Sequence, residues 1–137
     1  MKTPARGRAR KRVVIVDDEM AVGNMLAACC DMWGMEGIVT STAIEALGVI
    51  AETTPDAIVT DFMMPGMNGH ELVRAVRGNR RFVDVPLILM SAVPEAAAKD
   101  SPAADAFLAK PLDLDETERV LRQLTAGERK TRSRDRR

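Results

Sequence analysis

Five polar side chains that could carry out chemistry each end or directly follow an apolar run of the sequence. Such runs are typical of buried strands, and if their ends meet, three carboxylates, one hydroxyl and one ammonium group share a small space. Negative charge then exceeds positive charge by two, and crowded carboxylates resist ionising together unless something neutralises them. The five residues are Asp17, Asp18, Asp61, Ser91 and Lys110.

A divalent cation would cancel this excess of negative charge, and the ligand types favour Mg²⁺. This ion takes oxygen ligands and prefers one or two carboxylates plus water to a full protein cage. Zinc fits poorly, because His70 is the only histidine and Cys29 and Cys30 are adjacent within an expected helix. With the ion, a carboxylate beside Lys110 and Ser91 could accept a phosphoryl group, since both side chains and the ion can offset charge on the transferring oxygens.

The segments that must position these residues alternate between strand and helix patterns. Strands that are apolar on both faces indicate a parallel sheet with helices on each side, and ligands in such doubly wound sheets bind beyond the carboxyl ends of the strands. The five polar residues fall at those ends. Strands are predicted over residues 13–16, 38–40, 57–61, 86–91 and 106–110, and helices over 20–33, 43–51, 69–77 and 114–124.

Several residues predict where the helices begin and end. Asn68, with Glu71 three residues later, fits a capping box, and Asp113 fits an N-cap. Gly34 and Gly37 are predicted to end the first helix.

The composition fits one globular domain and excludes several other classes. The chain has 137 residues, of which 46% are hydrophobic and 29% charged, which is enough for one core and argues against wholesale disorder. No apolar run approaches the roughly 20 residues of a membrane helix, and residues 13–16 are too few for the core of a secretory signal. Cys29 and Cys30 are neighbours, which makes a poor disulfide and favours a reduced, cytoplasmic setting.

The formal net charge of zero hides two basic ends around an acidic middle. Residues 1–12 carry +6, residues 13–126 carry −10 and residues 127–137 carry +4. We therefore predict a basic N-terminal tail, a folded domain and a basic C-terminal tail with these bounds. The tails lack apolar periodicity, which is typical of solvated segments. They also lack interleaved aromatic residues for base stacking, which argues against nucleic acid as their partner.

Residues 13–124 resemble the receiver domain of two-component response regulators, of the stand-alone kind found among chemotaxis regulators. Four segments carry the resemblance, in the family's order and on the expected elements. The longest, Asp-Phe-Met-Met-Pro-Gly-Met-Asn-Gly at 61–69, fits the family's D-x-x-M-P-x-M-x-G loop at every fixed position. The others are Val-Asp-Asp-Glu at 16–19, Met-Ser-Ala at 90–92 and Phe-Leu-Ala-Lys-Pro at 107–111. Together the four are highly specific, whereas one alone would be weak.

The resemblance implies a flavodoxin-like α/β fold, with five parallel strands in the order 2-1-3-4-5 and helices on both faces. It implies that Asp61 accepts a phosphoryl group and helps to hold Mg²⁺. Asp18 would bind the ion directly, Asp17 through water, and the Met63 backbone carbonyl would be a further ligand.

The same resemblance assigns roles to the residues around the acceptor. Ser91 and Lys110 would bind the phosphoryl group, and Phe107 would swing with Ser91 on activation. Because Phe107 stands where a tyrosine could supply a hydroxyl, its coupling to the far face could be weaker. Pro111 would follow a cis peptide bond.

Some loop and helix residues are predicted to be structural. In the acceptor loop, Met64 and Met67 are expected to pack, and His70 to be plain surface. Pro94 and Pro102 leave only residues 95–99 free to form a fourth helix, which is therefore expected to be short or irregular. In the family this helix belongs to the usual output or dimer face.

We thus predict a single-domain response regulator that is not a conventional enzyme. Its partners would be a histidine kinase or histidine phosphotransfer protein, and downstream a target protein or a second copy of the chain. One alternative is a docking module that works without phosphorylation, and another is a receiver whose tails contact nucleic acid. A phosphatase of the dehalogenase type fits poorly, because that class wants acids two apart after its first strand, whereas Asp17 and Asp18 are adjacent and Met63 lies two beyond Asp61.

Overall fold

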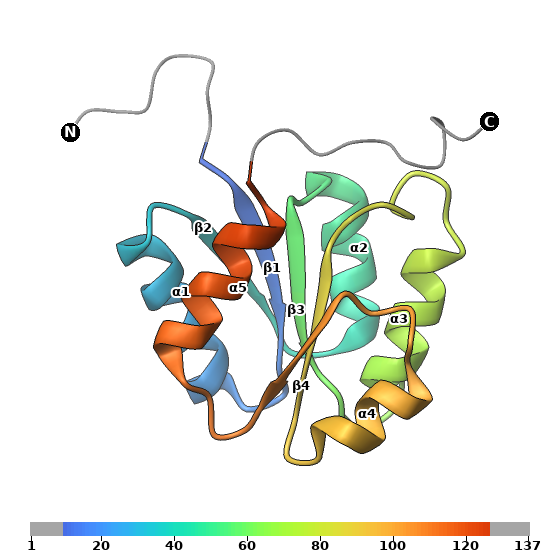
Figure 1. Cartoon of the computed structure of the whole chain (residues 1–137). Coiled ribbons are helices and arrows are strands. Elements are labelled where there is room, and N and C mark those ends of the chain that lie inside the picture. Colours follow the sequence, from blue (N-terminus) through green and yellow to red (C-terminus); the bar gives the residue numbers. More distant parts are fainter. Residues whose placement is uncertain (1–9, 127–137) are drawn as a thin grey trace.

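The computed structural model describes residues 10–126, so most of the predicted N-terminal tail (1–9) and all of the predicted C-terminal tail (127–137) lie outside the described residues. Five parallel strands form one sheet in the order β2-β1-β3-β4-β5, which confirms the predicted fold (Figure 1). The strands are β1 (Arg12–Val16), β2 (Glu36–Thr40), β3 (Ala57–Asp61), β4 (Leu87–Ser91) and β5 (Ala106–Ala109). The helices are α1 (Met20–Met32), α2 (Ala43–Thr53), α3 (Gly69–Arg77), α4 (Pro94–Asp100) and α5 (Leu114–Leu124).

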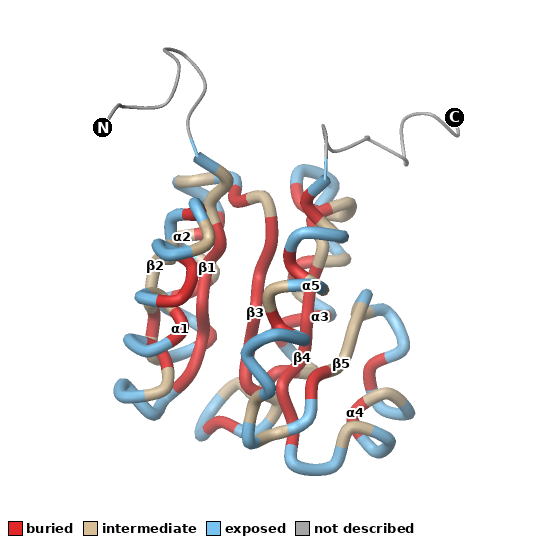
Figure 2. The backbone as a smooth tube through the Cα atoms, turned by 60° about the vertical axis from the view of Figure 1, so that its left-hand side comes forward, coloured by how far each residue is buried: buried red, intermediate tan, exposed pale blue. Residues whose placement is uncertain are grey.

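Alternate residues of each strand point to opposite faces of the sheet. Both sets are apolar, and helices cover both faces. Val14 and Val16 of β1 pack with α2 and α3, whereas Val13 and Ile15 pack with α1 and α5. The central strands β3 and β4 are buried along their whole length, and Figure 2 shows them as continuous buried segments inside the helices. This burial on both faces explains why the strands read as uninterrupted apolar runs.

The predicted helix starts are confirmed. Asn68 and Glu71 form a capping box at α3, with the Asn68 side chain accepting a hydrogen bond from the Glu71 backbone N–H. The Asp113 side chain caps α5 through the Glu116 N–H. The prediction for Gly37 was wrong, since this residue lies inside β2. A Cβ atom there would stand 2.9 Å from the Ala27 Cα, so glycine is needed where α1 crosses the strand.

The short fourth helix is confirmed, although α4 is one residue longer at each end than the predicted 95–99. Pro94 occupies its first turn, where the missing N–H costs nothing. Only Ala97 among its residues is buried. After the helix, the buried Ser101 hydroxyl lies 2.7 Å from Nδ1 of His70. His70 is therefore not plain surface as predicted, because it is half-buried and joins α3 to the end of α4.

One arginine connects three parts of the fold. Arg77, in the last turn of α3, donates from Nη1 to the carbonyls of Val83 and Val85 and from Nε to that of Ala103. Its Nη2 forms an ion pair of 2.7 Å with Asp105, whose same carboxylate oxygen accepts the Leu87 N–H. The guanidinium thus holds the end of α3 to the chain segments that lead into β4 and β5.

The boundary between the basic N-terminal tail and the domain lies earlier than the sequence indicated. Arg12 begins β1, and its guanidinium contacts Glu36 at 3.5 Å and the Thr53 carbonyl at 3.2 Å. Arg10 forms an ion pair of 2.8 Å with Asp31. These arginines belong to the folded part because they face acidic side chains and a helix end.

The two cysteines are free, as their adjacency predicted. Burial, and to a lesser degree the neighbouring Cys29, raises the pKa of Cys30 to about 11. A thiol with this pKa is a poor nucleophile near neutral pH. Within residues 10–126, no helix has the length and apolar composition that crossing a bilayer requires.

Candidate functional site

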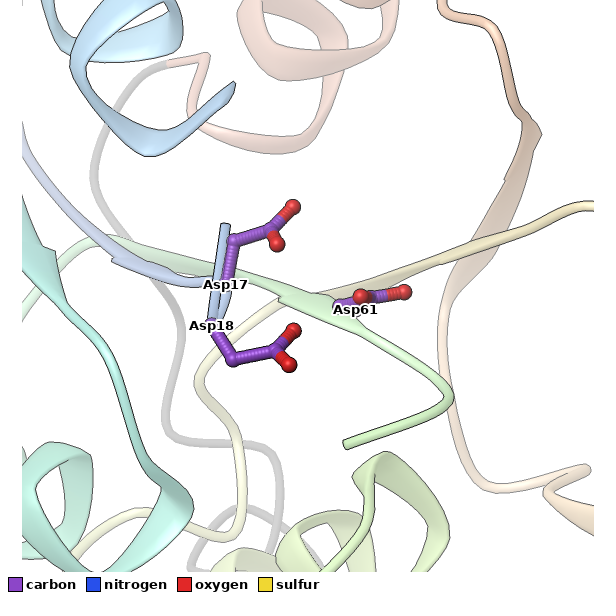
Figure 3. A group of neighbouring side chains, drawn as sticks. All are labelled: Asp17, Asp18 and Asp61. Carbon is purple, nitrogen blue, oxygen red and sulfur yellow. The ribbon is translucent and has the colours of Figure 1, made fainter. Parts of the chain in front are cut away.

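Three carboxylates meet at the carboxyl edge of the sheet. Asp17 and Asp18 follow β1 directly, and Asp61 is the last residue of β3, its neighbour in the sheet. One oxygen from each carboxylate lies within 4.8 Å of the others. Figure 3 shows the Asp17 and Asp18 side chains extending toward the side on which Asp61 lies. The convergence predicted from the strand ends is therefore present.

The two adjacent aspartates occupy different environments. Asp17 is fully buried, and its Oδ1 accepts a hydrogen bond of 2.9 Å from the Glu19 backbone N–H. Asp18 is exposed. The protein therefore holds the Asp17 carboxylate in place, while the Asp18 carboxylate stays open to solvent.

Lys110 adds a positive charge to this cluster from the end of β5, the outermost strand on one side of the sheet. It follows β5, and its Nζ lies 3.4 Å from carboxylate oxygens of both Asp17 and Asp61. The Lys110–Pro111 peptide bond is cis, as the resemblance implied, and the Lys110 N–H donates to the Ser91 carbonyl. Burial opposes the ammonium charge, but the nearby Asp61 and Asp17 outweigh it and raise the pKa of Lys110.

Asp61 is the carboxyl group whose ionisation the site disfavours. Burial raises the pKa of Asp61, Lys110 counteracts this, and the charges of Asp17 and Asp18 raise it further. One lysine therefore does not balance the three carboxylates. The three carboxylates offer only oxygen ligands, Asp18 is open to solvent, and their negative charge is not fully compensated. Such a site suits a hard divalent cation, so the residues present fit Mg²⁺.

This charge imbalance predicts the pH dependence of stability without divalent ions. A group whose pKa is raised by folding stabilises the protein below its unfolded pKa and loses that contribution as pH rises through the folded pKa. Asp61→Asn removes this pH-dependent contribution of Asp61 to stability. In EDTA at neutral pH the variant should therefore melt at or above the wild-type temperature. Its melting temperature should also fall less than that of the wild type between about pH 4 and pH 7.

The matched control for this experiment is Asp115→Asn, an exposed carboxylate in the first turn of α5. Losing that charge removes a favourable helix-dipole interaction, so the control should melt slightly lower than the wild type. A clearly lower melting temperature for Asp61→Asn in thermal scans would contradict the charge arrangement described above.

The remaining predicted residues border this cluster. Ser91 ends β4, next to β3, and its buried hydroxyl accepts the Val93 N–H at 2.9 Å. Phe107, on β5, is partly buried against the core cluster under α2 and α3. Met63 follows in the loop after Asp61 with its side chain 70% exposed, so its role could only be through the backbone.

The loop after Asp61 closes tightly onto the strand that precedes it. The Gly69 N–H donates to the Phe62 carbonyl, and a Cβ atom on Gly69 would stand 2.6 Å from the Asp61 carbonyl oxygen. Only glycine fits this approach, which brings the start of α3 beside Asp61. Gly66 has a φ of +75°, which favours glycine in the turn, and Met64 is buried as predicted.

One charged neighbour was missed from the sequence. Glu19 has a carboxylate oxygen 3.8 Å from Lys110 Nζ, so it adds negative charge at the rim. Its position directly after the two aspartates was the available signal.

A comparison with known proteins identifies the domain. A sequence profile described as the response regulator receiver domain matches residues 13–122. The chain belongs to this family. Receiver domains are signalling domains of two-component systems rather than conventional enzymes, and they interact with histidine kinases or phosphotransfer proteins.

Individual relatives agree with this assignment. The receiver is 35% identical over 104 residues to the phosphate regulon transcriptional regulatory protein PhoB of Pseudomonas aeruginosa, covering 74% of this chain and 45% of that protein. It is 35% identical over 127 residues to the response regulator MprA of Mycobacterium tuberculosis, covering 90% and 53%. The chain thus spans about half the length of these relatives.

Solved structures show the same fold. The chemotaxis protein CheY4 of Vibrio cholerae superposes with a TM-score of 0.78 at 26% identity, covering 85% of this chain and 99% of that one. The receiver domain of a signal transduction histidine kinase from Syntrophus aciditrophicus gives a TM-score of 0.78 at 25% identity, covering 85% and 91%.

Proposed function

We propose that this receiver accepts a phosphoryl group on Asp61 from the phosphohistidine of a histidine kinase or histidine phosphotransfer protein, with Mg²⁺ as the required cofactor. The phosphorylated receiver would then bind a downstream protein or a second copy of itself through an altered surface. The observation that carries the proposal is the cluster of three carboxylates within 4.8 Å, with Lys110 placed 3.4 Å from two of them.

The transfer needs a nucleophile and groups that offset charge on the phosphoryl oxygens. A carboxylate oxygen of Asp61 forms the new bond to phosphorus, while the bond from phosphorus to the donor nitrogen breaks and its electron pair returns to the imidazole. Lys110 and the Ser91 hydroxyl would contact the transferred oxygens. Asp17, Asp18, Asp61 and the Met63 carbonyl would hold Mg²⁺, which would supply the remaining positive charge.

The environment of Asp61 supports its role as the acceptor. It is buried except for 7% of its surface and ends β3 at the carboxyl edge of the sheet, and Lys110 holds it in place. Asp17 is fully buried and Asp18 is exposed, so neither combines the access and the lysine contact that Asp61 has.

Coupling to a partner would run through the neighbouring strands. Ser91 holds the start of α4 through the Val93 N–H, and Phe107 lies one strand away on β5. A change in the Ser91 hydrogen bonds on phosphorylation would therefore act first on α4 and β5. We propose Phe107 as the aromatic residue that responds.

Incubation with acetyl phosphate tests the function. The 137-residue protein should gain the mass of one phosphoryl group with Mg²⁺ and none with EDTA, measured by intact-protein mass spectrometry. A wild-type protein that stays unmodified, although it is folded by circular dichroism, would refute the acceptor role and favour a docking module that works without phosphorylation.

A further inference from the structure

A histidine in the first turn of α3 is hydrogen-bonded to the residue that ends α4. Nδ1 of His70 lies 2.7 Å from the Ser101 hydroxyl, and Figure 1 shows α4 beside the start of α3. Ser101 is only 1% exposed, and within residues 10–126 this is the one hydrogen bond found for its hydroxyl. A buried hydroxyl without a partner costs free energy, so the structure requires the imidazole at this position.

The backbone that leads into His70 lies directly against the acceptor residue of the proposed reaction. The Gly69 N–H donates to the Phe62 carbonyl at 2.9 Å, and a Cβ atom on Gly69 would stand 2.6 Å from the Asp61 carbonyl oxygen. The capping box at Asn68 fixes the first turn of α3 around this point. The position of His70 is therefore fixed relative to Asp61, and a shift of the Asp61 backbone would displace it.

At the other end of this hydrogen bond, Ser101 is the junction between α4 and the segment that leads to β5. Its N–H donates to the Ala97 carbonyl at 2.8 Å, which closes the last turn of α4, and its carbonyl accepts the Ala104 N–H at 3.1 Å. Ala97 is the one buried residue of this helix. Packing therefore contributes little to the position of α4, and the hydrogen bonds at its ends contribute more.

Serine hydroxyls hold both ends of α4. At its start, the Ser91 hydroxyl accepts the Val93 N–H. At its end, the Ser101 hydroxyl contacts His70. Each hydroxyl is linked to the end of β3, because Ser91 ends the neighbouring strand and His70 follows the loop that closes onto Asp61. A change at Asp61 therefore has two routes to α4, one to each end of the helix.

We propose that His70 is a positioning residue that transmits the state of Asp61 to the C-terminal end of α4 and to the segment that leads into β5. The inference rests on the proposed function, since phosphorylation is the change that His70 transmits. The Ser101 hydroxyl can donate to a neutral imidazole or accept from a protonated one, so the link exists in both protonation states of His70. The helix then shifts as a whole, whereas the Ser91 contact alone would move only its start.

Two-dimensional NMR of the isotope-labelled 137-residue protein tests this link, with beryllium fluoride and Mg²⁺ as a stable mimic of the phosphoryl group. His70 is the only histidine of the chain, so its ring signals are assigned without ambiguity. The Val93 amide reports on the start of α4, and the Ala104 amide reports on its end. When the mimic is added to the wild type, the His70 ring signals and both amide signals should shift.

Variants on both sides of the hydrogen bond isolate its contribution. His70→Phe keeps a ring but removes both nitrogens, and Ser101→Ala removes the hydroxyl. In each variant the Ala104 amide should lose its response to the mimic, while the Val93 amide keeps its own. His70→Asn places an amide atom where Nδ1 lies and should restore the Ala104 response. Arg74→Met, an exposed position on the same helix, should respond as the wild type does, and circular dichroism verifies each fold.

A wild-type response of the Ala104 amide in both His70→Phe and Ser101→Ala would overturn the proposed link. A wild-type protein in which only the Val93 amide shifts would overturn it as well, and an Asn variant that restores nothing would count equally against it. Failure of the proposed function gives a different result. In that case the wild type gains no phosphoryl group from acetyl phosphate and no amide shifts with the mimic, and the link falls with the function.

Discussion

Asp61→Asn should gain no phosphoryl group from acetyl phosphate and Mg²⁺, whereas the wild-type protein becomes modified. An amide is a far weaker nucleophile than a carboxylate, so the loss should be complete within detection. The substitution is nearly isosteric, and it removes negative charge from a site that already has an excess of it. The fold should therefore be retained, and circular dichroism should show this alongside the mass spectra.

The matched control is again Asp115→Asn, which makes the same chemical change on the exposed first turn of α5. It should be phosphorylated to the wild-type level under the same conditions. A full mass gain in Asp61→Asn would mean that another side chain is the acceptor, and the proposed function would then lose its central residue.

Arg77→Met should lower the free energy of unfolding by about 2–3 kcal/mol. The variant keeps the aliphatic length and the helix propensity of the residue but removes every hydrogen-bond donor. The carbonyls of Val83, Val85 and Ala103 lose their guanidinium partner, and Asp105 keeps the Leu87 N–H but loses its counter-ion. The Arg77 side chain is 17% exposed, so water replaces these bonds only in part.

Urea denaturation measures this loss, and Arg74→Met provides its control. Arg74 lies on the same helix, is exposed, and its change should stay within about 0.5 kcal/mol of the wild type. Equal unfolding midpoints for Arg77→Met and the wild type would show that the connection between α3, β4 and β5 contributes nothing to stability.

The sheet and the order of its elements could be predicted because the sequence pattern is strong there. Uninterrupted apolar runs such as residues 13–16 are typical of strands that are buried on both faces. Caps such as Asn68 and Asp113 act within three residues, so they too are visible from sequence. Gly37 and Arg12 were misplaced because their positions depend on α1 and α2 packing nearby, which no local pattern encodes.

The convergence of the site residues could be predicted because each ends or follows a predicted strand, but the environment of each group could not. The local pattern does not show that Asp17 is fully buried and Asp18 exposed. The contact of His70 with Ser101 and the bonds of Arg77 to Ala103 and Asp105 join residues 26 to 31 positions apart. Contacts between residues so far apart in sequence depend on the folded sheet, which brings their loops together.

The small size of α4 has a consequence for the native-state dynamics of this receiver. The helix buries one alanine, whereas α3 buries four side chains or backbone positions, so little free energy opposes its transient opening. Amide protons of α4 should exchange with deuterium far sooner than those of β3 and β4, which are buried throughout. Its two tethers, at Val93 and Ser101, would set how often it opens.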